Sequence, residues 1–395
     1  MHNPRGSMRI VDIREVSVPL EGNIANAVVS FAEHDVSLVA VESDVIRNGR
    51  PVTGYGFDSI GRFAQGGILR ARIIPRLRAA DPASLLDESG LRFDPGKVYA
   101  AAMRNEKPGG HGDRAAAVGA LELAIWDLNA KLADVPAHVL IARHFGRAPQ
   151  SQSADVYAAG GYYYPPGSGR TLRDEFAAYR DMGFTGFKMK IGGASLARDL
   201  ERIEEALGVA GSGAGLAVDA NGRFGLDTAL AYAEAIKGYG LRWYEEIGDP
   251  LDFDLNRRVA EVYDGPIATG ENLFSLADAV NLARYGGMRP GRDIFQMDAG
   301  LSYGLTEYAR MIDMLEANGF DRRSAHPHGG HLINLHIVVG LELGGCEAYP
   351  GVFQPFGGYA PSCALGGGQV RPSDAPGFGL EEKPELRNAI ARLAN

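Results

Sequence analysis

The sequence predicts an α/β fold: a (β/α)8 barrel of the modified TIM type, preceded by an N-terminal α+β capping domain. Three observations indicate this class. Short apolar strands alternate with amphipathic stretches over about residues 150–350. Strand-like segments and one long helical pattern come before them. Charged residues close successive strands about one strand–helix unit apart, which brings them to one barrel mouth.

The composition excludes several classes of protein. The chain has 395 residues, of which 45% are hydrophobic and 23% charged, and no run of 18 apolar residues that could cross a membrane as a helix. Its net charge is -9 without a basic cluster, which argues against nucleic acid and anionic membranes as partners. Cys346 and Cys363 are too few for a disulfide framework, so we expect a cytoplasmic protein.

Residues 8–145 form the predicted capping domain. Three segments rich in β-branched residues, 9–18, 37–46 and 51–57, predict a small antiparallel meander. The period then becomes helical, with apolar residues at Ala117, Leu121, Leu128 and neighbouring positions. We expect a buried helix there, within a helical layer.

Residues 150–350 form the predicted barrel domain, and residues 351–395 a C-terminal segment that returns to the capping domain. The eight expected strands are VYAAGG, FKMKI, LAVDAN, RWYEEI, PIATGEN, IFQMDA, RRSAHPH and CEAYP. The stretches between them, such as SLARDLERIEEALG, have the period of amphipathic helices. The segments 160–169 and 357–368 are glycine-rich and predict loops.

Three carboxylates end consecutive strands: Asp219, Glu245 and Glu271. Unpaired at one barrel mouth, they would repel one another, so a positive charge has to lie between them. Three carboxylates from different elements suit a hard divalent cation, and Mg²⁺ fits because it keeps positions open for water or substrate oxygen. The alternative is that each carboxylate pairs with a nearby lysine or arginine.

Lys188 and Lys190 flank one residue of the second barrel strand, so both side chains point to the same face, the barrel interior. We expect the two ammonium groups, and burial among Phe187, Met189 and Ile191, to lower their pKa values and favour a neutral base. The alternative is a lysine pair on a solvated strand.

His328 ends the seventh expected strand, and Asp298 ends the sixth beside it. A carboxylate next to an imidazole sets its tautomer and raises its pKa, which makes an acid–base group opposite Lys190. His326, His331 and His336 are expected to be structural. A zinc site of His326, His328 and His331 is the weaker alternative, because no cysteines accompany it.

Taken in order, KMK, DAN, EE, GEN, the Asp of the sixth strand and PHGG resemble the enolase superfamily, and the Lys-x-Lys and His–Asp pairs resemble its mandelate racemase subgroup. The resemblance covers nearly the whole chain from Met8. It implies that the carboxylate trio holds Mg²⁺, that Lys190 removes an α-proton, and that His328, oriented by Asp298, assists departure of a β-hydroxyl group.

The same resemblance implies substrate contacts. Lys188 would contact the substrate carboxylate, Glu347 would share a hydrogen bond with it, and Lys107 of the capping domain would contact a distal carboxylate. The expected reaction is dehydration of a small hydroxy diacid, most simply D-tartrate to oxaloacetate, by a carbon–oxygen lyase that forms a homo-oligomer. Asp58 departs from the uncharged residue expected at that position of the capping loop, which leaves the substrate open.

Three kinds of function stay in competition: a dehydratase, a racemase or epimerase, and a binding protein. Besides the diacid dehydratase, the chain could be another acid-sugar dehydratase, or a racemase or epimerase that passes the α-proton between Lys190 and His328. The third reading, of another class, is a non-catalytic binding protein. Formation of a 2-keto acid and exchange of the α-proton in D₂O would separate them.

Overall fold

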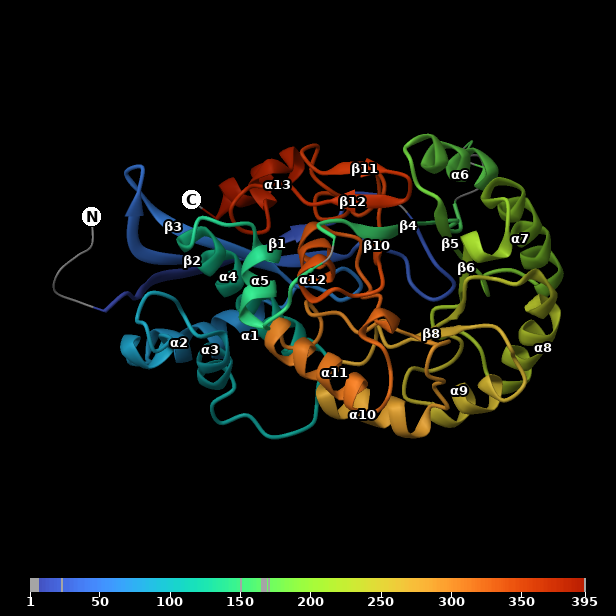
Figure 1. Ribbon diagram of the computed structural model, residues 1–395, viewed down its shortest axis with the longest axis horizontal. Coiled ribbons are helices and arrows are strands. Elements are labelled where there is room, and N and C mark those ends of the chain that lie inside the picture. The colour runs from blue at the N-terminus through green and yellow to red at the C-terminus, as the bar shows by residue number, and fades with distance from the viewer. Residues whose placement is uncertain (1–6, 23, 150, 165–168, 170, 394–395) are drawn as a thin grey trace.

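The computed structural model describes residues 7–22, 24–149, 151–164, 169 and 171–393. Part of the predicted loop 160–169 lies outside these residues. A small sheet and its helices occupy one end of the molecule, and a ring of helices surrounds the barrel at the other (Figure 1). In the described part of the chain, no helix is long and apolar enough to span a membrane.

The capping sheet is an antiparallel meander of β1 (Ile10–Pro19), β2 (Asp35–Arg47) and β3 (Arg50–Phe57), as predicted. Helix α4 (Asp113–Leu132) packs directly on β3 because glycines face it. A Cβ at Gly54 would lie 2.2 Å from the carbonyl oxygen of Ala124. The remaining helical segments are α1 (Gly66–Ile68), a π-helical turn (Leu69–Ile73), α2 (Ile74–Arg78), a 3₁₀ turn (Pro82–Leu85), α3 (Pro95–Ala102) and α5 (Ala137–His144).

The barrel strands run parallel in chain order, and the last strand closes the ring by pairing with the first. They are β4 (Ala154–Gly160), β5 (Gly186–Lys190), β6 (Leu216–Asp219), β7 (Tyr244–Glu245), β8 (Ile267–Thr269), β9 (Ile294–Phe295) and β10 (Cys346–Ala348). The predicted seventh strand, RRSAHPH, is wrong in detail. A 3₁₀ turn (Arg322–Ser324) comes first, and only a single bridge from Ala325 to Phe295 follows. Pro327 has no N–H to donate, but the N–H groups of His326 and His328 on either side of it donate to the carbonyl oxygens of Phe295 and Gln296 at 2.9 and 3.2 Å.

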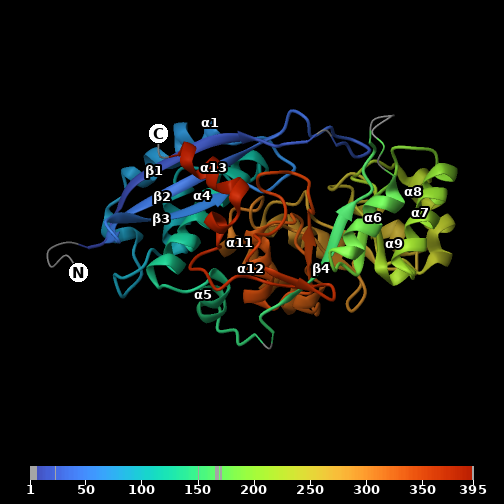
Figure 2. The same ribbon diagram turned by 90° about the horizontal axis from the view of Figure 1, so that it is seen from above.

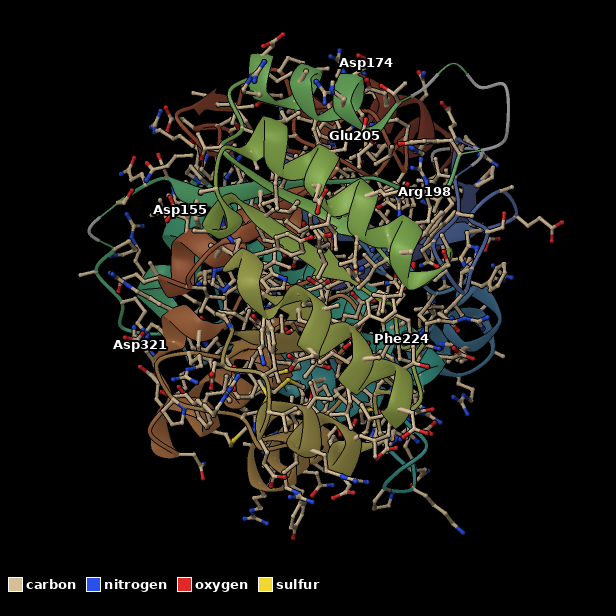
Figure 3. The ribbon with its side chains drawn as sticks, turned by 90° about the vertical axis from the view of Figure 1, so that its right-hand side faces the viewer. Asp155, Asp174, Arg198, Glu205, Phe224 and Asp321 are labelled. Atoms are coloured by element: carbon tan, nitrogen blue, oxygen red, sulfur yellow. The ribbon has the colours of Figure 1, made fainter. Side chains whose placement is uncertain are left out.

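Helices α6 (Leu172–Asp181), α7 (Leu196–Ala210), α8 (Leu226–Ile236) and α9 (Phe253–Ala260) lie along one side of the barrel, as Figure 3 shows. Helices α10 (Leu276–Tyr285), α11 (Leu305–Ala317) and α12 (Leu332–Leu341) complete the ring. Several start at a residue whose side chain accepts a hydrogen bond from the first turn, such as Thr171, Ser195 and Ser275. Each of these caps fixes the residue at which the preceding loop at the barrel mouth ends and its helix begins.

The C-terminal segment contacts both parts of the molecule. Its strands β11 (Ala364–Gly366) and β12 (Gln369–Arg371) form a hairpin, and β12 pairs with β4 of the barrel. Farther on, the Phe378 N–H donates to Asp127 of α4 at 2.6 Å, and α13 (Pro384–Arg392) lies near the capping sheet (Figure 2). The domain boundaries at 145–150 and 351 stay a prediction.

Candidate active site

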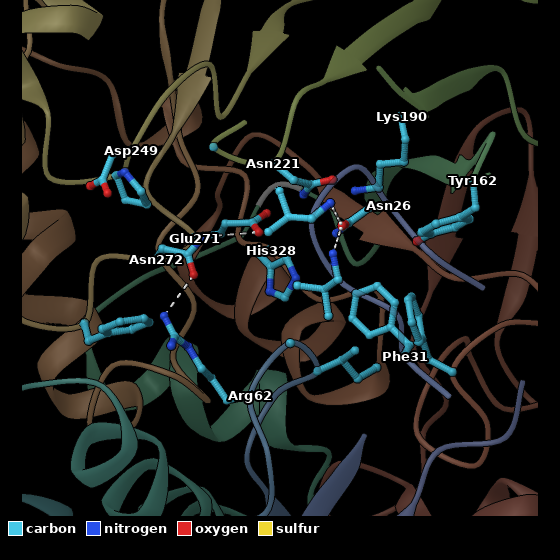
Figure 4. Close-up of a pocket in the computed structure, with 18 of the residues that line it drawn as sticks. Asn26, Phe31, Arg62, Tyr162, Lys190, Asn221, Asp249, Glu271, Asn272 and His328 are labelled. Carbon is cyan, nitrogen blue, oxygen red and sulfur yellow. Dashed lines mark hydrogen bonds between the residues drawn. The ribbon is translucent and has the colours of Figure 1, made fainter. Parts of the chain in front are cut away.

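A cavity of about 470 Å³ lies where the capping domain meets the carboxyl ends of the barrel strands (Figure 4). The barrel contributes Lys190, Glu271 and His328 to its lining, and the β1–β2 loop contributes apolar side chains such as Val28 and Phe31. Polar groups at one end and apolar groups at the other suit a small polar ligand covered by a loop.

The carboxylates of Asp219, Glu245 and Glu271 converge as predicted. One oxygen from each lies within 4.8 Å of the other two. Asp219 and Glu245 end β6 and β7 and are fully buried, whereas Glu271, after β8, also lines the cavity. Three oxygen donors, one of them open to the cavity, fit a hard divalent cation that keeps positions for other ligands.

Lys188 lies beneath the cavity floor, with 1% of its surface exposed. Its Nζ contacts Glu245, and lies 2.7 Å from Glu347 and 3.4 Å from Asp219. The expected lowering of its pKa is wrong. Burial would lower the pKa, but the three carboxylates outweigh it and raise the pKa of Lys188 well above its usual value.

Lys190, one strand position beyond Met189, reaches the cavity instead. Its Nζ lies 2.5 Å from Asp219 Oδ2 and 5.5 Å from the ring centroid of Tyr162. Two lysines on one face of β5 therefore do different things. Lys188 neutralises buried carboxylates, while Lys190 presents its amine to the cavity.

His328 and Asp298 form the predicted pair. His328 Nδ1 lies 3.2 Å from Asp298 Oδ2, and Nε2 lies 3.2 Å from the hydroxyl of Tyr349. Burial would lower the pKa of His328, but the carboxylates of Glu271, Asp298 and Glu347 raise it to about 9. These carboxylates therefore favour the protonated imidazole, the form that can donate a proton.

Capping-domain residues contact this pair. The Ser59 hydroxyl lies 2.9 Å from His331 Nε2, and it also bonds Asp298. A Cβ at Gly61 would lie 3.8 Å from Cε1 of His328. The loop that follows β3 thus lies directly against the histidine.

Glu347, on β10, lies beside the other site residues but is buried. One of its oxygens bonds Lys188, and the other accepts from the Gly329 N–H at 3.0 Å and the Tyr349 hydroxyl at 2.9 Å. It orders the residues around His328, and its predicted hydrogen bond to a substrate carboxylate stays a prediction.

Lys107 is not brought to the site. Its side chain is exposed and does not line the cavity, and its carbonyl oxygen accepts from Arg114. The structure also shows that Asp58, which departs from the expected uncharged residue, does not lie in the cavity lining. The Asp58 side chain is buried in the capping domain, where its Oδ1 accepts from the Ser37 N–H at 2.5 Å. Burial raises its pKa well above the usual value, and the residue adds no charge to the cavity lining.

Of the lining residues, sequence reasoning identified Lys190, Glu271 and His328, and among those it missed are Arg62, Tyr162 and Tyr349. Tyr349 lies two positions after Glu347, so strand alternation placed it on the same face and could have identified it. Arg62 lies in a loop, where no periodicity gives the direction of a side chain.

Comparisons with known proteins agree with this geometry. Residues 171–386 match the family model described as "Enolase C-terminal domain-like". Arabinonate dehydratase of Saccharolobus solfataricus is 28% identical over 340 residues, which cover 84% of this chain and 86% of that enzyme. L-talarate/galactarate dehydratase of Salmonella typhimurium is 26% identical over 331 residues, 82% of this chain and 77% of that enzyme.

Solved structures share the fold. L-talarate dehydratase from Polaromonas sp. JS666, complexed with Mg and L-glucarate, superposes with a TM-score of 0.74 at 23% identity and covers 97% of each chain. A racemase from Streptomyces coelicolor with bound magnesium has the same TM-score and identity, and covers 98% of this chain and 99% of its own.

Proposed function

This chain belongs to the enolase C-terminal domain-like family and is a Mg²⁺-dependent acid dehydratase of the mandelate racemase type, and we propose that its substrate is a small hydroxy diacid, most simply D-tartrate. In that reaction the α-proton and the β-hydroxyl group leave as water, and the enol product becomes oxaloacetate. The observation that carries the proposal is that Lys190 and His328 line one cavity together with a carboxylate of the metal trio.

Asp219, Glu245 and Glu271 are the residues that would hold Mg²⁺. The bound cation would supply positive charge that stabilises the negative charge building up on the substrate carboxylate as the α-proton leaves. Lys188 adds a second fixed positive charge beneath the trio, because its ammonium group is buried among carboxylates.

Lys190 is the proposed base. It is the lysine whose amine faces the cavity, and Asp219 holds that amine 2.5 Å away. The ring of Tyr162 covers it from one side. A substrate α-carbon beside Lys190 would lose its proton to Nζ.

His328 is the proposed acid. Asp298 fixes the ring through Nδ1, so Nε2 is the atom that would protonate the departing hydroxyl group. A hydroxide ion is a poor leaving group, and a protonated imidazole turns it into water. The Tyr349 hydroxyl, 3.2 Å from Nε2, lines the same cavity.

One observation supports a diacid. The name of the Salmonella relative gives talarate and galactarate as its substrates, and both are diacids. The relative that acts on arabinonate has a monoacid substrate, so substrate class has to be tested directly.

The test is to screen tartrate isomers, aldarates and aldonates for 2-keto acid formation with Mg²⁺, followed by proton NMR of the accepted substrate in D₂O. We expect His328→Asn to lose dehydration while the α-proton still exchanges with solvent, because proton removal precedes departure of the hydroxyl group. Lys190→Met should lose both. Each loss should be at least about 10²- to 10⁴-fold, the range for general acid–base catalysis.

The same experiment decides between the alternatives. Inversion of the α-carbon without a keto acid product would indicate a racemase or epimerase. Binding without any α-proton exchange would indicate a binding protein. Keto acid formation from aldonates alone would keep the dehydratase and reject the diacid. Cytoplasmic location and a homo-oligomeric state also stay predictions, and light scattering of the purified chain would test the second.

A further inference from the structure

We propose that Arg62 of the capping domain forms a carboxylate-binding subsite that makes the enzyme selective for diacids. The inference rests on the proposed function, because it assumes that a first carboxylate binds at the metal trio. It goes further by assigning recognition of the second carboxylate to one residue. The chemistry recognised is an unbranched hydroxy acid with a carboxylate at each end.

Arg62 lies in the loop after β3 and lines the cavity, as Figure 4 shows. Its Nη2 donates to Asn272 Oδ1 at 3.1 Å, and its guanidinium lies 4.7 Å from the ring centroid of Phe274. Asn272 is held in turn, since its amide donates to Glu246 at 3.1 Å. The guanidinium therefore has a fixed position above the barrel end that carries Glu271.

The charges of the lining favour an anion at Arg62. Lys190 also lines the cavity, but its Nζ already contacts Asp219 Oδ2 at 2.5 Å. Arg62 forms no ion pair within the described parts of the chain. Its one side-chain hydrogen bond within those parts uses Nη2 and goes to Asn272. A guanidinium has five N–H donors in a fork that matches a carboxylate, so the donors that Asn272 does not use favour such a ligand where Arg62 lines the cavity.

Neither of the two carboxylates in the cavity lining pairs with Arg62. Glu271 belongs to the metal trio, and Asp249 accepts from the Leu251 N–H at 2.9 Å in its own loop. A ligand carboxylate is therefore the charge that the cavity lacks beside Arg62. A methyl or hydroxymethyl group at the same place would leave the guanidinium unpaired.

The alternative anchor is Lys107, but its exposed side chain does not line the cavity. Substitution distinguishes the two residues. Only replacement of the residue that binds the distal carboxylate should change the preference between diacids and monoacids.

The experiment measures binding, so that it does not depend on turnover. Isothermal titration in Mg²⁺ would compare malate with 2-hydroxybutyrate, and 2-hydroxyglutarate with 2-hydroxyvalerate. Within each pair the chain length is equal and a distal carboxylate replaces a methyl group. In the pair whose diacid binds more tightly, we expect wild-type protein to bind the diacid at least about 10-fold more tightly than the monoacid. This factor is the lower end of the range for hydrogen bonds between charged groups.

Arg62→Gln should abolish that difference and leave the affinity for the monoacid unchanged, which also shows that the site is intact. Arg62→Lys keeps the charge and should retain part of the difference. Arg104→Gln is the matched control, because Arg104 is exposed on the capping domain and lines no part of this cavity.

Three results would overturn the assignment. They are a diacid preference that survives in Arg62→Gln, a preference lost in Lys107→Gln instead, and no preference in the wild-type protein. Failure of the proposed function is a separate outcome, since a protein that forms no keto acid can still bind diacids more tightly through Arg62.

Discussion

Replacing Asp298 by asparagine tests how the proposed acid is held. Asp298 is fully buried; its Oδ1 accepts from the Gly300 N–H at 2.8 Å, and its Oδ2 lies 3.2 Å from His328 Nδ1. Asparagine has one oxygen, and Gly300 needs it. The amide NH₂ would then face Nδ1, which would have to be an acceptor, so the imidazolium would lose its partner.

The size of the effect follows from the protonation of His328. With a pKa of about 9, nearly all of the imidazole is protonated at pH 7.5. Loss of the Asp298 carboxylate removes one of the three carboxylates that raise this pKa, so the pKa should fall and a smaller fraction of the imidazole should be protonated. Loss of ring orientation adds to this, and we expect dehydration to fall about 10²- to 10⁴-fold in total.

The assay is 2-keto acid formation between pH 6 and pH 10, with α-proton exchange followed by NMR. Wild-type dehydration should decline as the pH rises through about 9, because the acid loses its proton, and in Asp298→Asn the decline should move to lower pH. Exchange by Lys190 should persist. Asp313→Asn, a change of an exposed residue on α11, is the matched control. The reasoning would be refuted if Asp298→Asn formed 2-keto acid at a rate within about threefold of wild type and its rate declined at the same high pH.

Three further predictions follow from buried groups. Glu245→Gln should weaken Mg²⁺ binding by at least about 100-fold in calorimetry, because residues that merely support metal ligands already contribute 10- to 100-fold; unchanged affinity would contradict the metal site. Glu122→Gln should lower the free energy of unfolding by about 1–3 kcal/mol in urea, because an amide NH₂ would meet the Leu305 N–H that now donates to Glu122 at 2.8 Å; exposed Glu201→Gln should change it by less than about 0.5 kcal/mol. Burial lowers the pKa of His326 to about 3, so the unfolded chain takes up its proton below about 6.5 while the folded chain does not. Stability should therefore fall as the pH drops, by about 2 kcal/mol at pH 5 from this residue, and His326→Gln should lose that part of the pH dependence.

The barrel and its metal trio could be predicted because they depend on local patterns. Alternation along a strand gives the face of each side chain, and parallel strands bring their carboxyl ends to one mouth. Asp219 and Glu245 end apolar strands and Glu271 follows the next one by two residues, so their convergence follows from the order of elements. The pair of His328 and Asp298 follows in the same way, although the strand before His328 is reduced to one bridge.

The different roles of Lys188 and Lys190 could not be predicted from their spacing. Alternation places both on one face, but which amine is surrounded by carboxylates depends on the depth of each position in the barrel. The pKa of Lys188 depends on the balance between burial, which lowers it, and three nearby carboxylates, which raise it. That balance can be judged only when the distances between these groups are known.

The sequence by itself determined the order of most strands and helices, the convergence of three carboxylates at the barrel mouth and the pairing of His328 with Asp298. Only the tertiary structure decided which capping residues reach the cavity: Arg62 does and Lys107 does not, while Asp58 turns into the capping domain. The physical reason is that strand residues inherit their direction from a repeating backbone. Loop residues take theirs from contacts between segments far apart in the chain, such as that of Arg62 with Asn272.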